Sequence, residues 1–339
     1  MFRVRFSLAS LLLLFLSSGL IYSLITPPFE APDEVWHYAY VRHLVEKHTL
    51  PALDDADSGA YQEVAQPPLY YAAAALLSGF APDDDMPELM WHNPGFGYQA
   101  GGTTNDNKNM LIHTQRERFP WQGAALAIRL ARFASLVFGL VTVWAAWGLG
   151  HEAFPHRPGW ALGAATLVAF TPQFLFISGV VSNDSAAAAL STAALWAIAR
   201  TINHGVTSRR SLVIGLLIGL AALTKTSCLL LGLPGVTVVI FAPGSRLRTH
   251  SHRGRRSFVV RHLLLVTLVA LTVGGGWYLR NALLYRDPLA ISVHLNTPWG
   301  RTAPASVITI LSQLPEVYKS FWGAFGWGHV GFPSWVYLA

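Results

Sequence analysis

Long apolar runs constrain this chain more than any other feature. The first, residues 6–26, is long enough to cross a bilayer, which takes about 20 apolar residues. Of the 339 residues, 52% are hydrophobic and only 12% are charged, which excludes an ordinary soluble domain. The sequence therefore predicts an all-α protein, a polytopic helical bundle that forms a single membrane domain over residues 1–339. Its expected spans are approximately 6–26, 124–150, 160–179, 185–199, 211–223, 229–242 and 262–279.

Basic residues between these runs predict the orientation. Arg157 follows the second run, residues 200–210 contain three arginines, and residues 246–261 contain six. Lys and Arg concentrate in cytoplasmic loops, so these linkers and the N-terminus are placed in the cytoplasm. Seven spans follow, with residues 27–122 as a first external loop and 280–339 as a second external segment. The first apolar run is longer than the core of a signal peptide, and we interpret it as an uncleaved anchor.

A shorter apolar stretch, residues 67–80, lies inside the first external loop. As a full crossing it would move residues 246–261 outside and residues 83–85, three aspartates, inside, against the charge pattern. Its length of about 13 residues also falls short of a span. We therefore expect a juxtamembrane helix, with Tyr70 and Tyr71 at the level of the headgroups.

Three carboxylates, Glu30, Asp33 and Glu34, directly follow the first span. Ionisable groups at a membrane are costly to desolvate, so acids at this place suggest chemistry at the membrane surface. The alternative is a hydrated turn around Pro32 that ends the helix. The motif alone does not separate these two interpretations.

Further polar residues are expected at the same external face. The tip of the hairpin 211–242 holds Lys225 among three hydroxyl side chains, which suits a lipid phosphate. A lysine that snorkels to the interface would also explain it. Asp184 precedes an alanine-rich helix and either caps that helix or supplies a further acid. Arg280 ends the seventh span beside aromatic residues.

Other chemistries lack their motifs. The sequence has no Walker loop and no G-x-G-x-x-G after a strand, and its histidines have no metal-ligand spacing, so no metal site is predicted. Cys228 is the only cysteine, which excludes an internal disulfide. The net charge of +6 comes from Lys and Arg in short linkers, so no nucleic-acid partner is expected.

Four motifs, in a fixed order after the acidic pair, carry a resemblance to a known superfamily. They are Gln66-Pro67-Pro68-Leu69-Tyr70-Tyr71, Arg129-Leu130-Ala131-Arg132-Phe133, Asn183-Asp184 and Leu223-Thr224-Lys225. In their order and spacing the chain resembles the GT-C membrane glycosyltransferases, and within them the bacterial relatives of the protein O-mannosyltransferases and the aminoarabinose lipid A transferases. The resemblance covers most of the chain.

The resemblance implies a many-helix membrane fold, a polyprenyl-phosphate-linked sugar bound from the outer leaflet, and an acid of the first external loop near the reacting sugar. By position, that acid is Asp33 or Glu34. Gln66 departs from the family, whose members commonly carry a titratable His there. Some uncharacterised bacterial families of the superfamily share the Gln-Pro-Pro form and an element like residues 321–327. Members usually have several more spans, so the interpretation of a truncated product, inactive despite its site residues, stays open.

The sequence thus predicts a glycosyltransferase that moves a sugar from a polyprenyl-phosphate donor to an acceptor outside the cytoplasm, in the inner membrane of a bacterium. Asp33 would be the general base, and Glu34 and Asp184 would position the sugar or the acceptor. The lipid phosphate and the donor would contact Lys225, Arg280, Tyr70, Tyr71 and Gln66. No cofactor is required, although the acids could hold a divalent cation. The alternative is a non-catalytic transporter or envelope-assembly scaffold, but no inverted repeat is visible and the polar groups gather at the outer face.

Overall fold

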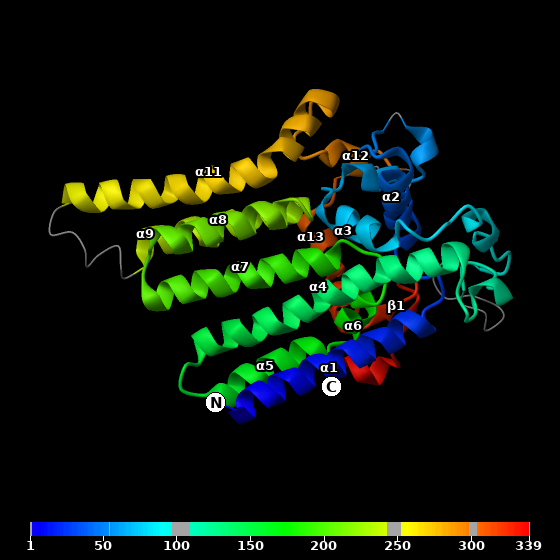
Figure 1. Ribbon diagram of the computed structural model, residues 1–339, viewed down its shortest axis with the longest axis horizontal. Coiled ribbons are helices and arrows are strands. Elements are labelled where there is room, and N and C mark those ends of the chain that lie inside the picture. The colour runs from blue at the N-terminus through cyan, green and yellow to red at the C-terminus, as the bar shows by residue number, and fades with distance from the viewer. Residues whose placement is uncertain (1, 54, 97–108, 243–251, 298–303, 339) are drawn as a thin grey trace.

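Long helices lie side by side and account for most of the molecule (Figure 1). The computed structural model describes residues 2–53, 55–96, 109–242, 252–297 and 304–338. The long or apolar helices are α1 (Phe2–Ile25), α4 (Gly123–Ala153), α5 (Pro158–Ala169), α6 (Pro172–Ser178), α7 (Asp184–His204), α8 (Ser208–Ala222), α9 (Gly232–Phe241) and α11 (His252–Tyr285). The prediction of an all-α polytopic membrane protein is confirmed.

The membrane-spanning candidates are fewer than the sequence predicts. Within the described residues, α1, α4, α7 and α11 are each long and apolar enough to cross a membrane. A fifth span results if α5 and α6 are taken together, although they are bent by 64°. Pro172 at the start of α6 has no N–H and breaks the helix at this bend. The two remaining expected spans are shorter, with 15 residues in α8 and an apolar helical segment over Thr226–Phe241, so the seven-span topology stays a prediction.

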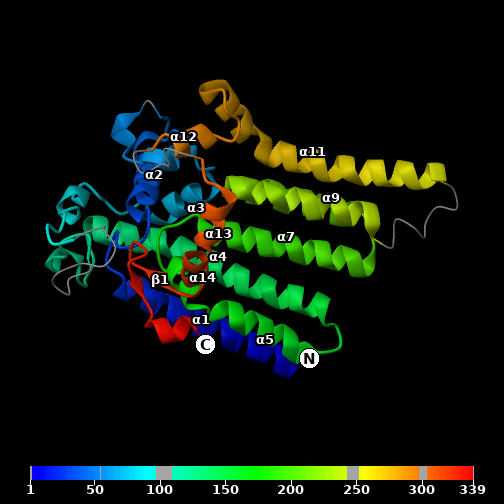
Figure 2. The same cartoon turned by 180° about the vertical axis from the view of Figure 1, so that it is seen from behind.

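The connections divide between the two ends of the bundle. The N-terminus and the α4–α5 and α7–α8 connections lie at one end, and the segments around α2 and α3 lie at the other (Figures 1 and 2). This alternation agrees with the arrangement that the basic linkers predict. The juxtamembrane stretch is a helix of only 10 residues, α3 (Leu69–Ser78), at the end that also carries α2.

The expected external segments form short elements. The first contains α2 (Glu34–Lys47), α3 and the 3-10 turns η1 (Ala56–Ser58), η2 (Tyr61–Ala65), η3 (Met86–Leu89) and η4 (Gln115–Glu117). The second contains α12 (Ile291–Leu295), α13 (Val307–Ser312), α14 (Leu314–Trp322) and η6 (Ser334–Tyr337). The only strands among the described residues, β1 (Ala324–Phe325) and β2 (Val330–Gly331), pair antiparallel with Ala324 opposite Gly331. The remaining 3-10 turn, η5 (Thr226–Leu231), precedes α9.

Small residues allow the helices to approach closely. A Cβ atom on Gly219 of α8 would lie 2.9 Å from the carbonyl oxygen of Ala270 in α11. A Cβ atom on Gly274 would lie 3.0 Å from the carbonyl oxygen of Gly219. Such close backbone contact is a usual way for membrane helices to associate, because lipid supplies no hydrophobic force between them.

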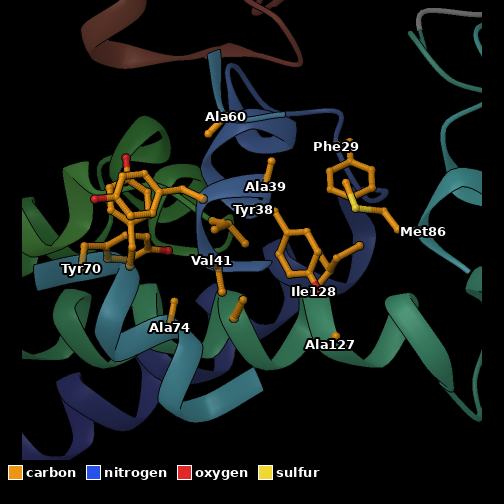
Figure 3. Packing of buried hydrophobic residues seen from close by; sticks show 14 of the residues in the cluster. Phe29, Tyr38, Ala39, Val41, Ala60, Tyr70, Ala74, Met86, Ala127 and Ile128 are labelled. Carbon is orange, nitrogen blue, oxygen red and sulfur yellow. The ribbon is translucent and has the colours of Figure 1, made fainter. Parts of the chain in front are cut away.

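The first external segment packs on the beginning of α4. Side chains of α2 and α3, among them Tyr38, Val41 and Ala74, meet Ala127 and Ile128 of α4 in one buried cluster (Figure 3). Asp85 fixes the same junction, because its Oδ1 accepts the backbone N–H of Ala124 at 2.7 Å. An acceptor at this place satisfies one of the free N–H groups of the first turn. The helix that follows the acidic motif, α2, is therefore held against a long membrane helix.

Candidate active site

The acidic motif adopts an unusual backbone conformation. Phe29 and Asp33 both lie in the left-handed region, with φ of 66° and 58°. This conformation is rare for a bulky residue such as Phe29 and costs on the order of 1–3 kcal/mol, whereas aspartate tolerates it better. Phe29 is buried, and its N–H donates to Oε2 of Glu34 at 3.0 Å. The surrounding contacts therefore hold the strained segment in place.

Glu34 forms a fully buried ion pair with Arg132 of α4. The guanidinium Nε and Nη2 donate to the two carboxylate oxygens, each at 2.7 Å. Oε1 also accepts the backbone N–H of Val181 at 2.9 Å. Arg132 donates further to the carbonyl oxygens of Ser23, Thr26 and Pro27. Glu34 thus ties together the end of α1, α4 and the segment before α7, which differs from the predicted role of positioning a sugar or acceptor.

Glu30 is also held by structural contacts. Its carboxylate accepts the N–H groups of Met110 and Leu111, at 2.9 and 2.8 Å, and contacts Nε2 of His113 at 3.0 Å. Burial alone would lower the pKa of His113, but the carboxylates of Glu117 and Glu30 outweigh it and raise that pKa to about 9. His113 is therefore a cation that joins two carboxylates. Glu30 and Glu34 thus have structural partners, and Asp33 is the remaining acid of the cluster.

Asp33 presents a carboxylate that forms no hydrogen bond or ion pair with the described part of the chain. The residue is the N-cap of α2 and makes no side-chain capping bond. Burial raises the pKa of Asp33, while the charge of Lys225 lowers it and that of Asp184 raises it again. The charges of Lys225 and Asp184, which are distant from Asp33 in the sequence, therefore influence its protonation.

Asp184 and Lys225 form an ion pair, with Nζ 2.5 Å from Oδ1. Asn183, not Asp184, is the N-cap of α7, so the capping interpretation of Asp184 is wrong. Both side chains are partly exposed, at 49% and 33%. They line a cleft of about 460 Å³ whose other walls are mainly apolar side chains of α7 and the η5 turn, including Ala187 and Leu230.

Gln66 connects two of the segments that form this region. Its Oε1 accepts Nδ2 of Asn183 at 3.1 Å, and the same Nδ2 donates to the carbonyl oxygen of Thr224 at 3.0 Å. The N–H of Leu69 donates to the carbonyl oxygen of Leu223 at 2.9 Å. The Gln-Pro-Pro loop, the start of α7 and the hairpin tip are therefore held together by direct hydrogen bonds.

The tyrosine pair lies beneath the protein surface. Tyr70 is fully buried, with its hydroxyl 2.7 Å from that of Ser135 and accepting the N–H of Ser182 at 2.9 Å. Tyr71 is also fully buried and stacks on Tyr40, with ring centroids 3.9 Å apart. Both rings therefore pack in the core that supports the site, which differs from the predicted direct contact with the donor.

His37 and Glu63 complete the polar region and are not among the predicted site residues. Nδ1 of His37 lies 2.8 Å from the Tyr71 hydroxyl and 3.2 Å from Oε2 of Glu63, and the same hydroxyl donates to Glu63 at 3.2 Å. Burial lowers the pKa of His37 to about 3. Burial, and next the charge of Asp33, raise the pKa of Glu63 to about 8. Near neutral pH both groups are therefore uncharged, and Glu63 carries a proton next to Asp33.

Of these two residues, only His37 could have been recognised from the sequence. It stands four residues after Asp33, a spacing that places two residues on one face of a helix. Glu63 lies in a 3-10 turn of the loop, where no periodicity points to it.

Arg280 contacts other parts of the molecule. Its guanidinium lies 4.9 Å from the ring centroid of Trp277, and Nη2 donates to the carbonyl oxygen of Pro51 at 2.7 Å. No contact that the described residues make joins it to Lys225. Among the described residues, no group of three or more His, Cys, Asp or Glu side chains is arranged to hold a metal ion.

One comparison bears on what this region can do. Residues 124–274 match the family of dolichyl-phosphate-mannose-protein mannosyltransferases. The predicted resemblance to GT-C membrane glycosyltransferases is thereby confirmed. No curated protein and no solved structure matches the chain.

The mannosyltransferase match begins just inside α4 and ends within α11, so it includes Asp184 and Lys225. Asp33 and Glu63 precede it. The match indicates a glycosyltransferase of the GT-C type that is embedded in a membrane by several helices.

Proposed function

We propose that the chain transfers a sugar from a polyprenyl-phosphate donor to a hydroxyl group of an acceptor on the external face of a bacterial inner membrane, with the N-terminus in the cytoplasm. The observation that carries this proposal is the Asp33 carboxylate, which has no hydrogen-bond or ion-pair partner among the described residues and whose pKa responds to the charges of the Asp184–Lys225 pair. This region combines a base with a cation next to an apolar cleft. The description of the matched family, dolichyl-phosphate-mannose-protein mannosyltransferase, supports a lipid-phosphate-linked sugar as the donor.

The donor would lie in the cleft at Asp184 and Lys225. The Lys225 ammonium has three N–H donors, and one of them bonds to Asp184. The other donors can reach a phosphate oxygen. The apolar walls from Ala187 to Leu231 suit a polyprenyl chain. A lipid phosphate requires a cation for its phosphate group and an apolar wall for its chain, and this cleft has both.

The reaction follows from this placement. An oxygen of the acceptor hydroxyl attacks the anomeric carbon of the sugar, the bond from that carbon to the phosphate oxygen breaks, and polyprenyl phosphate leaves. Asp33 takes the hydroxyl proton, which is typically worth about 10²- to 10⁴-fold in rate. Its raised pKa makes it a better base than an exposed aspartate. Lys225 stabilises the charge that develops on the leaving phosphate.

The acceptor would approach through one of two outer cavities, the larger of which lies along α2. A cavity of about 570 Å³ is lined by Trp36, Arg42 and Trp327, and Trp36 stands one helical turn after Asp33. A second cavity of about 360 Å³ shares Tyr61 with it. Both cavities are lined by residues of the segments expected to be external, and neither shares a lining residue with the cleft at Asp184 and Lys225.

Release of polyprenyl phosphate tests the function. The purified protein in detergent is mixed with polyprenyl-phosphate-linked sugars that carry a label on the lipid, and the free lipid phosphate is measured with and without an envelope extract as acceptor source. We expect release with at least one sugar and stimulation by the extract. Equal release by the wild type and by Asp33→Asn would contradict the proposal.

A further inference from the structure

We propose that the cavity between the end of α1 and the beginning of α4 binds the phosphate headgroup of an anionic membrane lipid. This site does not rest on the proposed glycosyl transfer. The cavity has a volume of about 490 Å³, and its walls include Leu24, Ile25, His113, Glu117, Arg118 and Arg129. It shares no lining residue with the cleft at Asp184 and Lys225.

Arg129 is the main candidate to bind an anion in this cavity. Its Nη1 donates to the carbonyl oxygen of Ser23 at 2.9 Å, and its guanidinium lies 4.7 Å from the ring centroid of Trp121. Nε is buried and has no hydrogen-bond partner in the described part of the chain. No carboxylate of the described residues forms an ion pair with Arg129. A partly buried guanidinium at a membrane boundary is costly without a counter-ion.

The other charges of the cavity leave a net positive surface. His113 lies between two carboxylates, 3.0 Å from Glu30 and 2.8 Å from Glu117, so it offsets one of these two negative charges, and Arg118 and Arg129 together outweigh the other. Arg118 is exposed, and its guanidinium has no ion pair within the ranges that the structure describes. Arg118 and Arg129 therefore offer two guanidinium groups to one ligand. Guanidinium groups bind phosphate oxygens through paired hydrogen bonds.

The rim of the cavity identifies the phosphate as part of a lipid. Leu24 and Ile25 close the first membrane span and are 46% and 67% exposed. Phe119, next to Arg118, is 79% exposed. Apolar and aromatic side chains at the end of a span face acyl chains and headgroups, and basic pockets between such spans bind anionic headgroups. Free phosphate would gain nothing from this rim.

Lipid titration followed by native mass spectrometry tests the site. The full chain in detergent is titrated with phosphatidylglycerol, phosphatidylcholine, polyprenyl phosphate or inorganic phosphate, and bound molecules are counted. We expect phosphatidylglycerol to bind more tightly than phosphatidylcholine. Arg129→Gln should weaken its binding by about 10-fold or more, the usual effect of losing a charge-assisted hydrogen bond. Arg116→Gln is the matched control, because Arg116 lies in the same loop but pairs with Glu88 at 2.6 Å.

Each result decides the proposal. Equal phosphatidylglycerol binding by Arg129→Gln and Arg116→Gln would overturn it, and binding of inorganic phosphate as tight as that of the lipid would overturn the assignment to a lipid. Polyprenyl phosphate binding that depends on Lys225 but not on Arg129 would confirm that the two sites are separate. If Arg129→Gln does not fold because the Ser23 contact is lost, Arg118→Gln, which breaks no internal hydrogen bond of the described residues, decides in its place.

Discussion

At the scale of single residues, the partners of each carboxyl group decide which acids can react. Glu30 and Glu34 are each surrounded by donors, whereas the Asp33 carboxylate has no such partner among the described residues. Glu63 is different again, because it is buried beside Asp33 and stays protonated near neutral pH. Two neighbouring carboxyl groups with different environments are a common basis for acid and base roles.

Glu63→Gln should change how stability depends on pH. The pKa of Glu63 is about 8 in the folded protein, above the 4.5 usual for a glutamate side chain, so its contribution to stability is present below about pH 4.5 and is lost as the pH rises towards 8. Glutamine cannot titrate. We expect the Tm of the wild type to fall between pH 5 and 8 relative to that of Glu63→Gln. Parallel Tm curves, measured in detergent beside the exposed control Glu316→Gln, would contradict a buried protonated Glu63.

Lys225→Met should weaken binding of polyprenyl phosphate, because it removes the charge and keeps the aliphatic stem. The expected loss is about 1.5–3 kcal/mol, the usual contribution of a charge-assisted hydrogen bond. Asp184→Asn is the control, since it keeps the cation and polyprenyl phosphate carries no sugar. Fluorescent lipid binding measures both variants. Unchanged affinity of a folded Lys225→Met protein would show that the lysine only snorkels to the interface.

At the scale of elements, the Glu34–Arg132 pair joins α2 to α4 and both to the end of α1. Glu34→Gln would leave the guanidinium buried without its counter-ion, which typically costs about 3–5 kcal/mol. We therefore expect a marked fall in Tm and in the folded fraction on size exclusion. The double variant Glu34→Gln/Arg132→Met should recover part of this loss. Normal stability of Glu34→Gln would contradict the structural role.

The sequence predicts the elements better than the contacts between them. Apolar runs located the long helices, since their length and composition are local properties. The partners of Glu34 and Tyr70 could not be predicted, because Arg132 and Ser182 are about 100 residues away in the chain and meet them only in the folded bundle. Asp184 shows the same limit: its local context suggests a cap, and only the folded hairpin brings Lys225 to it.

At the scale of the whole molecule, the connections alternate between two ends of the bundle (Figures 1 and 2). Reporter fusions at Asp85 and Val330 should therefore be external, and those at Arg157, Gly205 and Arg253 cytoplasmic, because basic linkers stay inside. Alkaline phosphatase and green fluorescent protein fusions measure this directly. A cytoplasmic signal at Asp85 would mean that α3 crosses the membrane. Asp33 and Lys225 would then no longer be expected on one face.

The central claim is that Asp33 is the base of a lipid-dependent sugar transfer. The most direct test compares the wild type with Asp33→Asn. Single-turnover transfer and donor binding are measured for both proteins. Asparagine tolerates the left-handed backbone at this position, so the fold should be kept. We expect transfer to fall by about 10²-fold or more while donor affinity changes little. Wild-type transfer by a folded Asp33→Asn protein, or an equal loss of donor binding and transfer, would contradict the account.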